Sequence, residues 1–246
     1  SLATYAAAAA FCLPSFQIYA YWATGFGFAW SMVLCTLGWL AWERLPLSAG
    51  KRSYGMKCLG VALIATALLN YPPTAFFFFA IIAVEGVAFG DSARRMLRRF
   101  WSAIVLTVLG LIVCIAVGTI TIKLLGTGAA ARTALVTPSA IGDKLIWIIK
   151  EPIAIGLRPF MVDYPTGVGW ITVVPTVLIL GIALIIQARR LKESWVLRII
   201  AVAAPLLATL GLFYIIAENY LEFRFIPGLV WGIGTITIFV VLAGLR

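Results

Sequence analysis

The sequence predicts an all-α protein, a polytopic transmembrane helix bundle with roughly eight membrane segments, from its composition, its apolar runs and its charge pattern. Hydrophobic residues make up 63% of the 246 residues, charged residues only 11%, and the mean hydropathy is +1.07. Soluble domains carry about a quarter of their residues as charges. At about 20 apolar residues per crossing, the length allows roughly seven or eight crossings.

Eight apolar runs fill the chain, and we assign them to a single transmembrane domain over residues 1–246. They cover residues 2–13, 26–42, 58–70, 74–90, 100–125, 168–187, 199–217 and 226–245. The first run is shorter than a full span, and no basic region precedes it as in a signal peptide. We therefore expect the chain to be a fragment that begins partway through a helix, with an N-terminal part missing.

The third and fourth runs predict a helical hairpin with a short first arm. Residues 58–70 give only about 20 Å of helix, against a hydrocarbon core of about 30 Å. Irregular backbone below the membrane surface requires burial in protein or a watery cavity. The tip residues Asn70, Tyr71 and Pro72 are therefore predicted to line an outward-opening cavity. The alternative is a helix that starts earlier, near Tyr54, with a tip that reaches the surface.

Basic residues predict the orientation of the bundle. Of the 19 Lys and Arg residues, 13 lie in four stretches that we assign to one side of the membrane: residues 43–57, 91–99, 188–198 and 246. Such an excess is typical of the cytoplasmic side of a membrane protein. Nucleic-acid binding is not expected despite the net charge of +10, because it requires basic residues gathered on one solvated face.

Residues 140–165 form the one long segment that is neither a span nor a short connection. Apolar residues between 141 and 149 share one arc of a helical wheel, and the opposite arc carries charges, namely Asp143, Lys144, Lys150 and Glu151. Pro152 is expected to end this helix. The pattern predicts an amphipathic helix that lies in the membrane interface on the outer side.

Polar residues that follow this helix, together with two from the last outward connection, are the candidate substrate-binding residues. They are Arg158, Asp163, Tyr164, Glu222 and Arg224. An Arg can hold a phosphate with two parallel N–H donors, and a carboxylate can take a proton from an acceptor hydroxyl. This set therefore suits a lipid-linked phosphate. The alternative is that these charges only solvate connections between helices.

The residue types exclude several kinds of chemistry. The chain has no histidine, which removes Ser-His-Asp hydrolysis and HExxH zinc chemistry. No metal-binding motif, P-loop or dinucleotide-binding fingerprint occurs. The four cysteines all lie inside apolar runs, as small buried side chains do.

Two features inside the apolar runs have open interpretations. Glu85 is either functional, as a carboxylate within a span usually is, or paired with an arginine at the cytoplasmic end. Gly86 with Gly90, and Gly228 with Gly232, have GxxxG spacing. Because the helices are rich in small residues, we expect these pairs to pack within one bundle rather than between two copies.

Three stretches together resemble a known family, the glucosyltransferases that decorate bacterial O-antigen using polyprenyl-phosphate glucose. LNYPPTAF at residues 69–76 looks like the Tyr-x-Pro-Ala hairpin of that family, and KLIWIIKEPIAIGL at residues 144–157 is similar to its amphipathic outward segment. RFIP at residues 224–227 looks like its Arg-x-x-x-Pro motif at a helix start. The resemblance covers residues 60–246. Pro72 departs from the family, which often has Gln there, so no side-chain role is carried over to it.

The resemblance implies a GT-C type membrane glycosyltransferase of the bacterial inner membrane with an outward-facing active site. Its donor would be a polyprenyl-phosphate sugar, its acceptor a cell-envelope glycan, and membrane lipid would surround it. Arg158 and Arg224 would contact the phosphate, and Asp163, Tyr164 and Glu222 the sugar. The catalytic acidic residue would precede Ser1 and is not assigned, and a divalent cation stays open as a cofactor.

Two other functions remain open on the sequence. A multi-span transporter or lipid flippase is favoured by Pro175 and Pro205, which can kink helices, and by Glu85 inside a span. Against this function, no inverted repeat is detectable. The third possibility is a non-catalytic subunit of an envelope enzyme complex.

Overall fold

The computed structural model describes residues 2–11, 26–43, 51–126, 136–158, 169–214 and 227–244. Within these ranges every element is a helix and no strand occurs, which confirms the all-α prediction. Among the described residues, three helices are long and apolar enough to cross a membrane, with candidate spans at Ser53–Asn70, Ala93–Leu125 and Val173–Arg190. Shorter apolar helices occur at Pro72–Ala88, Trp195–Ala208 and Gly228–Ala243.

Each predicted apolar run overlaps one of the main helices. These are α1 (Leu2–Phe11), α3 (Phe26–Glu43), α4 (Lys51–Asn70), α5 (Phe78–Ala88), α6 (Ala93–Leu125), α9 (Gly169–Arg190), α10 (Trp195–Ala208) and α11 (Pro227–Gly244). A short helix η3 (Pro72–Thr74) follows α4, and η7 (Gly211–Tyr214) follows α10. Between α6 and α9 lies a separate helical segment made of η5 (Pro138–Ala140), α7 (Ile141–Ile148), η6 (Ile149–Ile153) and α8 (Ala154–Gly156).

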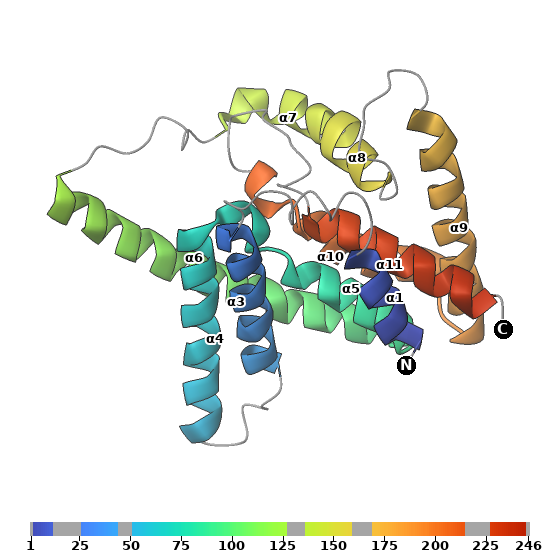
Figure 1. Ribbon diagram of the computed structural model, residues 1–246, viewed down its shortest axis with the longest axis horizontal. Helices are drawn as coiled ribbons and strands as arrows, with labels where there is room; N and C mark the ends of the chain where they lie inside the picture. The colour runs from blue at the N-terminus through green and yellow to red at the C-terminus, as the bar shows by residue number, and fades with distance from the viewer. Residues whose placement is uncertain are drawn as a thin grey trace.

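Helix α5 lies at the centre of the bundle, where α3, α6, α10 and α11 pack around it (Figure 1). Phe78 and Phe79 are at most 1% exposed, and their rings stack with centroids 4.4 Å apart. The 11 residues of α5 correspond to about 17 Å of helix, well below the thickness of a hydrocarbon core. This helix therefore depends on its neighbours for burial.

The first arm of the predicted hairpin is longer than expected. Helix α4 begins at Lys51, so its 20 residues correspond to about 30 Å. The expected arm of residues 58–70 alone is therefore wrong, and the alternative of an earlier helix start is confirmed, because the preceding polar residues continue the helix instead of forming a loop. Lys, Arg and Met are good helix formers, and long basic side chains can extend into water beyond an apolar core. The short arm of the hairpin is the second one, α5. Because α4 is long enough to span a hydrocarbon core, its length no longer predicts a tip below the membrane surface.

Helix α6 also begins before its apolar run. The Ser92 hydroxyl oxygen accepts a hydrogen bond from the Arg95 backbone N–H and caps the helix. The basic stretch 93–99 therefore forms the first turns of a helix and not a connection. With 33 residues, α6 is about 50 Å long. Most side chains from Ile112 to Leu125 are exposed, and this half of α6 projects away from the other helices (Figure 1).

Glycines allow the closest helix crossings. At the crossing of α3 and α4, a Cβ on Gly60 would lie 2.9 Å from the Gly38 carbonyl oxygen. On α11, a Cβ on Gly228 would meet Thr209 at 3.0 Å, and one on Gly232 would meet Leu206 at 2.5 Å. The prediction that this GxxxG pair packs within one bundle is confirmed.

The two glycines of the other GxxxG pair, Gly86 and Gly90, have different structural roles. Gly86 of α5 packs against Met96 of α6, because a Cβ at Gly86 would lie 2.4 Å from the Met96 methyl group. Gly90 adopts a φ of +67° in the turn between these helices. This left-handed conformation favours glycine, and no other atom lies within 4 Å of a Cβ there. Gly86 is thus a packing residue and Gly90 a turn residue.

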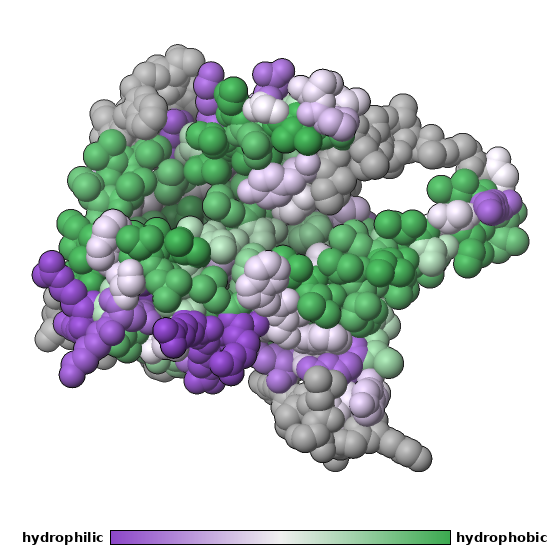
Figure 2. Space-filling model, turned by 180° about the vertical axis from the view of Figure 1, so that it is seen from behind, coloured by the Kyte–Doolittle hydropathy of each residue, from purple (hydrophilic) through white to green (hydrophobic). Residues whose placement is uncertain are grey.

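Charged side chains gather at one end of the bundle, which we call the basic pole. It consists of the C-terminal end of α3, the α5–α6 turn with the first turns of α6, and the α9–α10 turn. Arg99 pairs with Glu43, and the Ala93 N–H donates to Glu193 Oε2 at 2.8 Å. Figure 2 shows hydrophilic residues along this lower edge, below a broad hydrophobic surface. The sequence predicts that three of these stretches share one side of the membrane. Parts of them do meet, at Glu43, 91–99 and 188–198.

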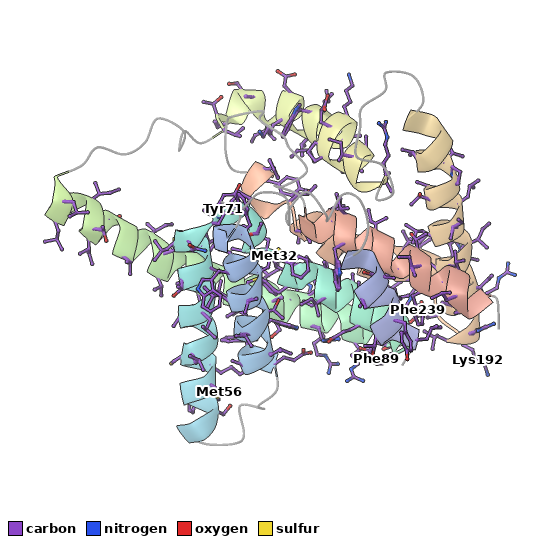
Figure 3. All side chains as sticks on the ribbon, in the orientation of Figure 1. Met32, Met56, Tyr71, Phe89, Lys192 and Phe239 are labelled. Atoms are coloured by element: carbon purple, nitrogen blue, oxygen red, sulfur yellow. The ribbon has the colours of Figure 1, made fainter. Side chains whose placement is uncertain are left out.

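The other end, which we call the tip pole, consists of η3, η7 and the segment α7–α8. Helix η7 contacts both η3 and α7, so these elements form one surface. Figure 3 shows Tyr71 at this end and Phe89 and Lys192 toward the basic pole. The hairpin tip and the predicted amphipathic segment therefore lie at the same end of the protein.

We predict that Gly60→Ala destabilises the bundle, because the new methyl group would press on backbone and not on a flexible side chain. Overpacking of this kind typically costs about 1–3 kcal/mol. Thermal unfolding of the purified protein in detergent measures the effect. Gly118→Ala on α6 is the matched control, since a Cβ there meets no atom within 4 Å. An unchanged melting temperature for Gly60→Ala would contradict the packing described for α3 and α4.

Candidate functional site

The segment α7–α8 runs across the tip pole (Figure 1). Its bundle-facing side carries four buried residues at helical spacing: Lys144, Ile148, Pro152 and Ile155. A second apolar side is open, with exposed fractions of 46–62% at Ile141, Leu145, Ile146 and Ile149. The helix is therefore amphipathic as predicted, but its apolar arc is divided between the protein and the exterior.

Lys144 lies on the buried side, and its predicted place among the exposed charges is wrong. The side chain is 5% exposed, and Nζ lies 4.2 Å from the centroid of the Trp147 ring. The Trp147 ring in turn packs on Phe213 of η7, with centroids 5.9 Å apart. An ammonium over an aromatic face is attracted by the ring quadrupole, which offsets part of the desolvation. Burial lowers the pKa of the Lys144 ammonium below its usual value.

Pro152 does not end the helix, contrary to the sequence expectation. Residues Ile149–Ile153 form a π-helical turn, and the chain continues as α8 to Gly156. Proline lacks an N–H and its ring clashes with the carbonyl one α-turn earlier. A wider π-turn accommodates the ring, as such turns do inside α-helices. The segment therefore reaches one turn further than predicted.

Gly156 docks the end of this segment on the start of α11. A Cβ at Gly156 would lie 2.3 Å from Cδ2 of Leu229, so a larger residue would require the Leu229 side chain to shift. Arg158 follows two residues later, and its backbone N–H donates to the Ile155 carbonyl at 2.9 Å. The predicted candidate Arg158 is thereby held where α8 meets α11.

The Arg158 side chain has unused hydrogen-bonding capacity. Its Nε is buried and has no hydrogen-bond partner among the residues that the structure describes. Among the described residues, none of the ion pairs includes Arg158. A buried donor without an acceptor costs about 1–3 kcal/mol, and more when it is charged. The arrangement therefore suits an anion with two or more oxygens, which a guanidinium binds as a fork.

The tip residues predicted to line a cavity make contacts with α3. Asn70 Nδ2 donates to the Gly27 carbonyl at 2.7 Å and to Ser31 Oγ at 2.9 Å. The Tyr71 ring lies edge-on to Phe28, with centroids 4.0 Å apart. Pro72 begins η3. These contacts fix the hairpin tip to α3, and the cavity lined by Asn70, Tyr71 and Pro72 stays a prediction.

The remaining candidate residues, Asp163, Tyr164, Glu222 and Arg224, lie outside the described residues, and their roles stay predictions. Across the ranges that are described, no group of three or more Cys, Asp or Glu side chains is placed to hold a metal ion. Of the candidate set, Arg158 and the three tip residues are described, and both groups lie at the tip pole.

At the basic pole, Arg99 joins three carboxylates. Its guanidinium pairs with Glu43, with Glu85 at 2.5 Å and with Asp91 at 3.4 Å. Glu85 therefore reaches an arginine at this end, which was one of its two predicted interpretations. Each carboxylate comes from a different part of the chain, so Arg99 holds the end of α3, α5 and the α5–α6 turn together.

Arg198 is a second basic-pole residue, and the sequence analysis counted it only as an orienting charge. It is fully buried and donates to the Gly86 carbonyl at 3.1 Å and to Gln187 Oε1 at 2.6 Å. Its position was detectable, because Arg198, Ala201, Val202 and Pro205 have helical spacing and share the buried face of α10.

The two poles thus differ in what they offer a ligand. At the basic pole, carboxylates and carbonyls already occupy Arg99 and Arg198. At the tip pole, Arg158 retains a buried donor. Comparisons with protein-family models, with curated proteins and with solved structures give no match. The tip pole around Arg158 is therefore the candidate functional site on its chemistry alone.

We predict that Arg99→Met destabilises the protein, because three carboxylates would lose their shared cation. The expected loss is roughly 3 kcal/mol, the lower end of the range for breaking a buried ion pair. Denaturant unfolding in detergent measures it. Arg98→Met is the control, since Arg98 is its exposed neighbour on α6 and should change stability by less than about 0.5 kcal/mol. Equal effects of the two substitutions would refute the structural role of Arg99.

We also predict a pH dependence of stability that originates at Lys144. Burial lowers the pKa of Lys144 in the folded protein below its ordinary value of 10.5. At a pH between the folded and the unfolded pKa, the unfolded protein therefore binds more protons at this residue. Stability should therefore rise as pH increases through that window. Melting curves from about pH 8 to 11 would show this rise in the wild type. Lys144→Met should lose this part of the rise, whereas the exposed-site control Lys150→Met should keep it. Superimposable profiles for wild type and Lys144→Met would argue against this.

Proposed function

We propose that this protein acts in a GT-C type membrane glycosyltransferase that transfers a sugar from a polyprenyl-phosphate carrier to a cell-envelope glycan. The observation that carries the proposal is the half-buried Arg158, whose Nε has no hydrogen-bond partner in the described part of the chain. A polyprenyl-phosphate sugar bears an anionic phosphate between its lipid and its sugar. In this proposal Arg158 binds that phosphate at the outer face of the bacterial inner membrane.

The distribution of polar and apolar surface supports a multi-pass orientation. Lys- and Arg-rich segments meet at the basic pole, and such segments remain preferentially in the cytoplasm. Large apolar side chains are exposed along the sides of the helices, for example Ile115 at 65% and Ile182 at 57%. Lipid would cover them, and the tip pole with Arg158 would then face outward.

The open apolar side of α7 supports contact between the tip pole and the membrane interface. Leu145, Ile146 and Ile149 are exposed there, while Asp143 and Lys150 are exposed toward the remaining side. An amphipathic helix in the interface buries its apolar side at the boundary of headgroups and acyl chains. A donor whose prenyl chain stays in the bilayer would then present its phosphate at the level of Arg158.

The transporter alternative has less support than the sequence suggested. Glu85, the carboxylate that favoured it, is paired with Arg99. Helices α9 and α10 both run without a break through Pro175 and Pro205. Broken helices with exposed termini, on which many transporters build their sites, do not occur at these two prolines.

The test is binding of a photoreactive polyprenyl-phosphate glucose to membranes that contain the protein. We expect Arg158→Ala to weaken binding roughly tenfold to a hundredfold, the value of a hydrogen-bonded charge. Arg158→Lys should be intermediate, because it keeps the charge but not the fork. Lys150→Ala, an exposed cation on the same segment, serves as the control. The proposal would fail if the wild type did not bind this donor, or if Arg158→Ala bound it as well as the wild type.

A further inference from the structure

A pocket lies at the opposite end of the protein from Arg158, between α9 and α11 beside the end of α5. Its volume is about 210 Å³. Seven apolar residues line it, together with Gln187 and Arg190: Val87, Ala183, Leu184, Ile186, Phe239, Val240 and Ala243. Figure 3 shows Phe239 on the same side of the molecule as Phe89 and Lys192, toward the basic pole.

The surroundings of this pocket are apolar on the outside as well. Ile182 and Ile186 of α9 are 57% and 47% exposed, and Val241 of α11 is 43% exposed. The candidate span Val173–Arg190 ends at the pocket. In a membrane these side chains would contact lipid tails, so the pocket would lie beside hydrocarbon. An aliphatic chain is the ligand that such a lining accepts.

Of the two polar residues at the pocket, only Arg190 is available to a ligand. Gln187 is used on both sides, because Nε2 donates to the Val87 carbonyl at 2.8 Å and Oε1 accepts from Arg198. Arg190 is exposed, and within the described ranges none of the ion pairs includes it. The nearby carboxylate Glu193 is already paired with Arg198 at 3.5 Å. The pocket therefore combines an apolar interior with Arg190, the last residue of α9, a cation that none of the ion pairs between described residues includes.

We propose that this pocket binds part of one acyl chain of an anionic phospholipid and that Arg190 binds its phosphate. An apolar pocket between membrane helices with a basic residue at the headgroup level is the arrangement that recognises anionic lipids. The position on the basic pole separates this site from the donor site proposed at Arg158. The inference does not depend on the proposed transfer reaction.

Native mass spectrometry of the full chain released from detergent tests the proposal, with dioleoyl-phosphatidylglycerol as the probe and dioleoyl-phosphatidylcholine as the neutral comparison. We expect the wild type to retain the anionic lipid preferentially. Arg190→Gln should weaken that binding at least about fivefold, the effect of one cation near a lipid headgroup. Arg189→Gln is the matched control, because Arg189 is an exposed neighbour that does not line the pocket.

A second variant tests the acyl-chain part without a change of charge. Ala183→Phe should fill the pocket and weaken lipid binding, whereas Val177→Phe, exposed on the same helix, should not. Melting curves without added lipid show whether each variant is folded. Equal effects of Arg189→Gln and Arg190→Gln, unchanged binding by folded Ala183→Phe, or competition by glycerol phosphate alone would each overturn the proposal.

Discussion

The fold depends on the hydrogen bonds that the backbone carbonyls at the C-terminal end of α5 accept. A helix leaves its last four carbonyls without intrahelical donors. At α5 the following turn supplies one such donor, since the Asp91 N–H donates to the Gly86 carbonyl at 3.0 Å, and side chains of two neighbouring helices supply more. Arg198 donates to the Gly86 carbonyl and to the Asp91 carbonyl, and Gln187 donates to the Val87 carbonyl. The guanidinium also matches the partial negative charge of a helix C-terminus. Because Arg198 belongs to α10 and Gln187 to α9, one cluster fixes both helices against α5.

The two poles divide stability and binding between them. At the basic pole, Arg99 and Arg198 are enclosed by Glu43, Glu85, Glu193 and backbone oxygens, so the charges there hold helices together. At the tip pole, a long connection has folded into α7 and α8 and rests on η7 and α11 through few contacts. Such a surface can admit a ligand without loss of the core, and it leaves the guanidinium of Arg158 partly unsatisfied.

The sequence predicts the existence and order of the helices well because hydropathy measures what must avoid water. It predicts helix ends poorly, since these depend on hydrogen bonds such as the cap by Ser92 and on polar residues that continue α4 back to Lys51. For the site, the sequence predicts Arg158 as a phosphate-binding residue, and that role stays a prediction. The burial of Lys144 was not, because the Trp147–Phe213 pair that receives it joins segments far apart in the chain. The packing of Gly156 was not predicted either, because its partner Leu229 lies on the last helix and no local sequence pattern connects the two.

The π-turn at Ile149–Ile153 also determines which way the chain faces beyond it. Each residue of an α-helix turns the chain by about 100°, and a π-turn inserts one residue without adding a turn. All side chains after Pro152 are therefore rotated by about 100° relative to a regular continuation of α7. In regular register, Gly156 would point away from Leu229 and a bulkier residue would meet α11. The single extra residue thus rotates the second half of the helix, so that α7 contacts η7 while α8 contacts α11.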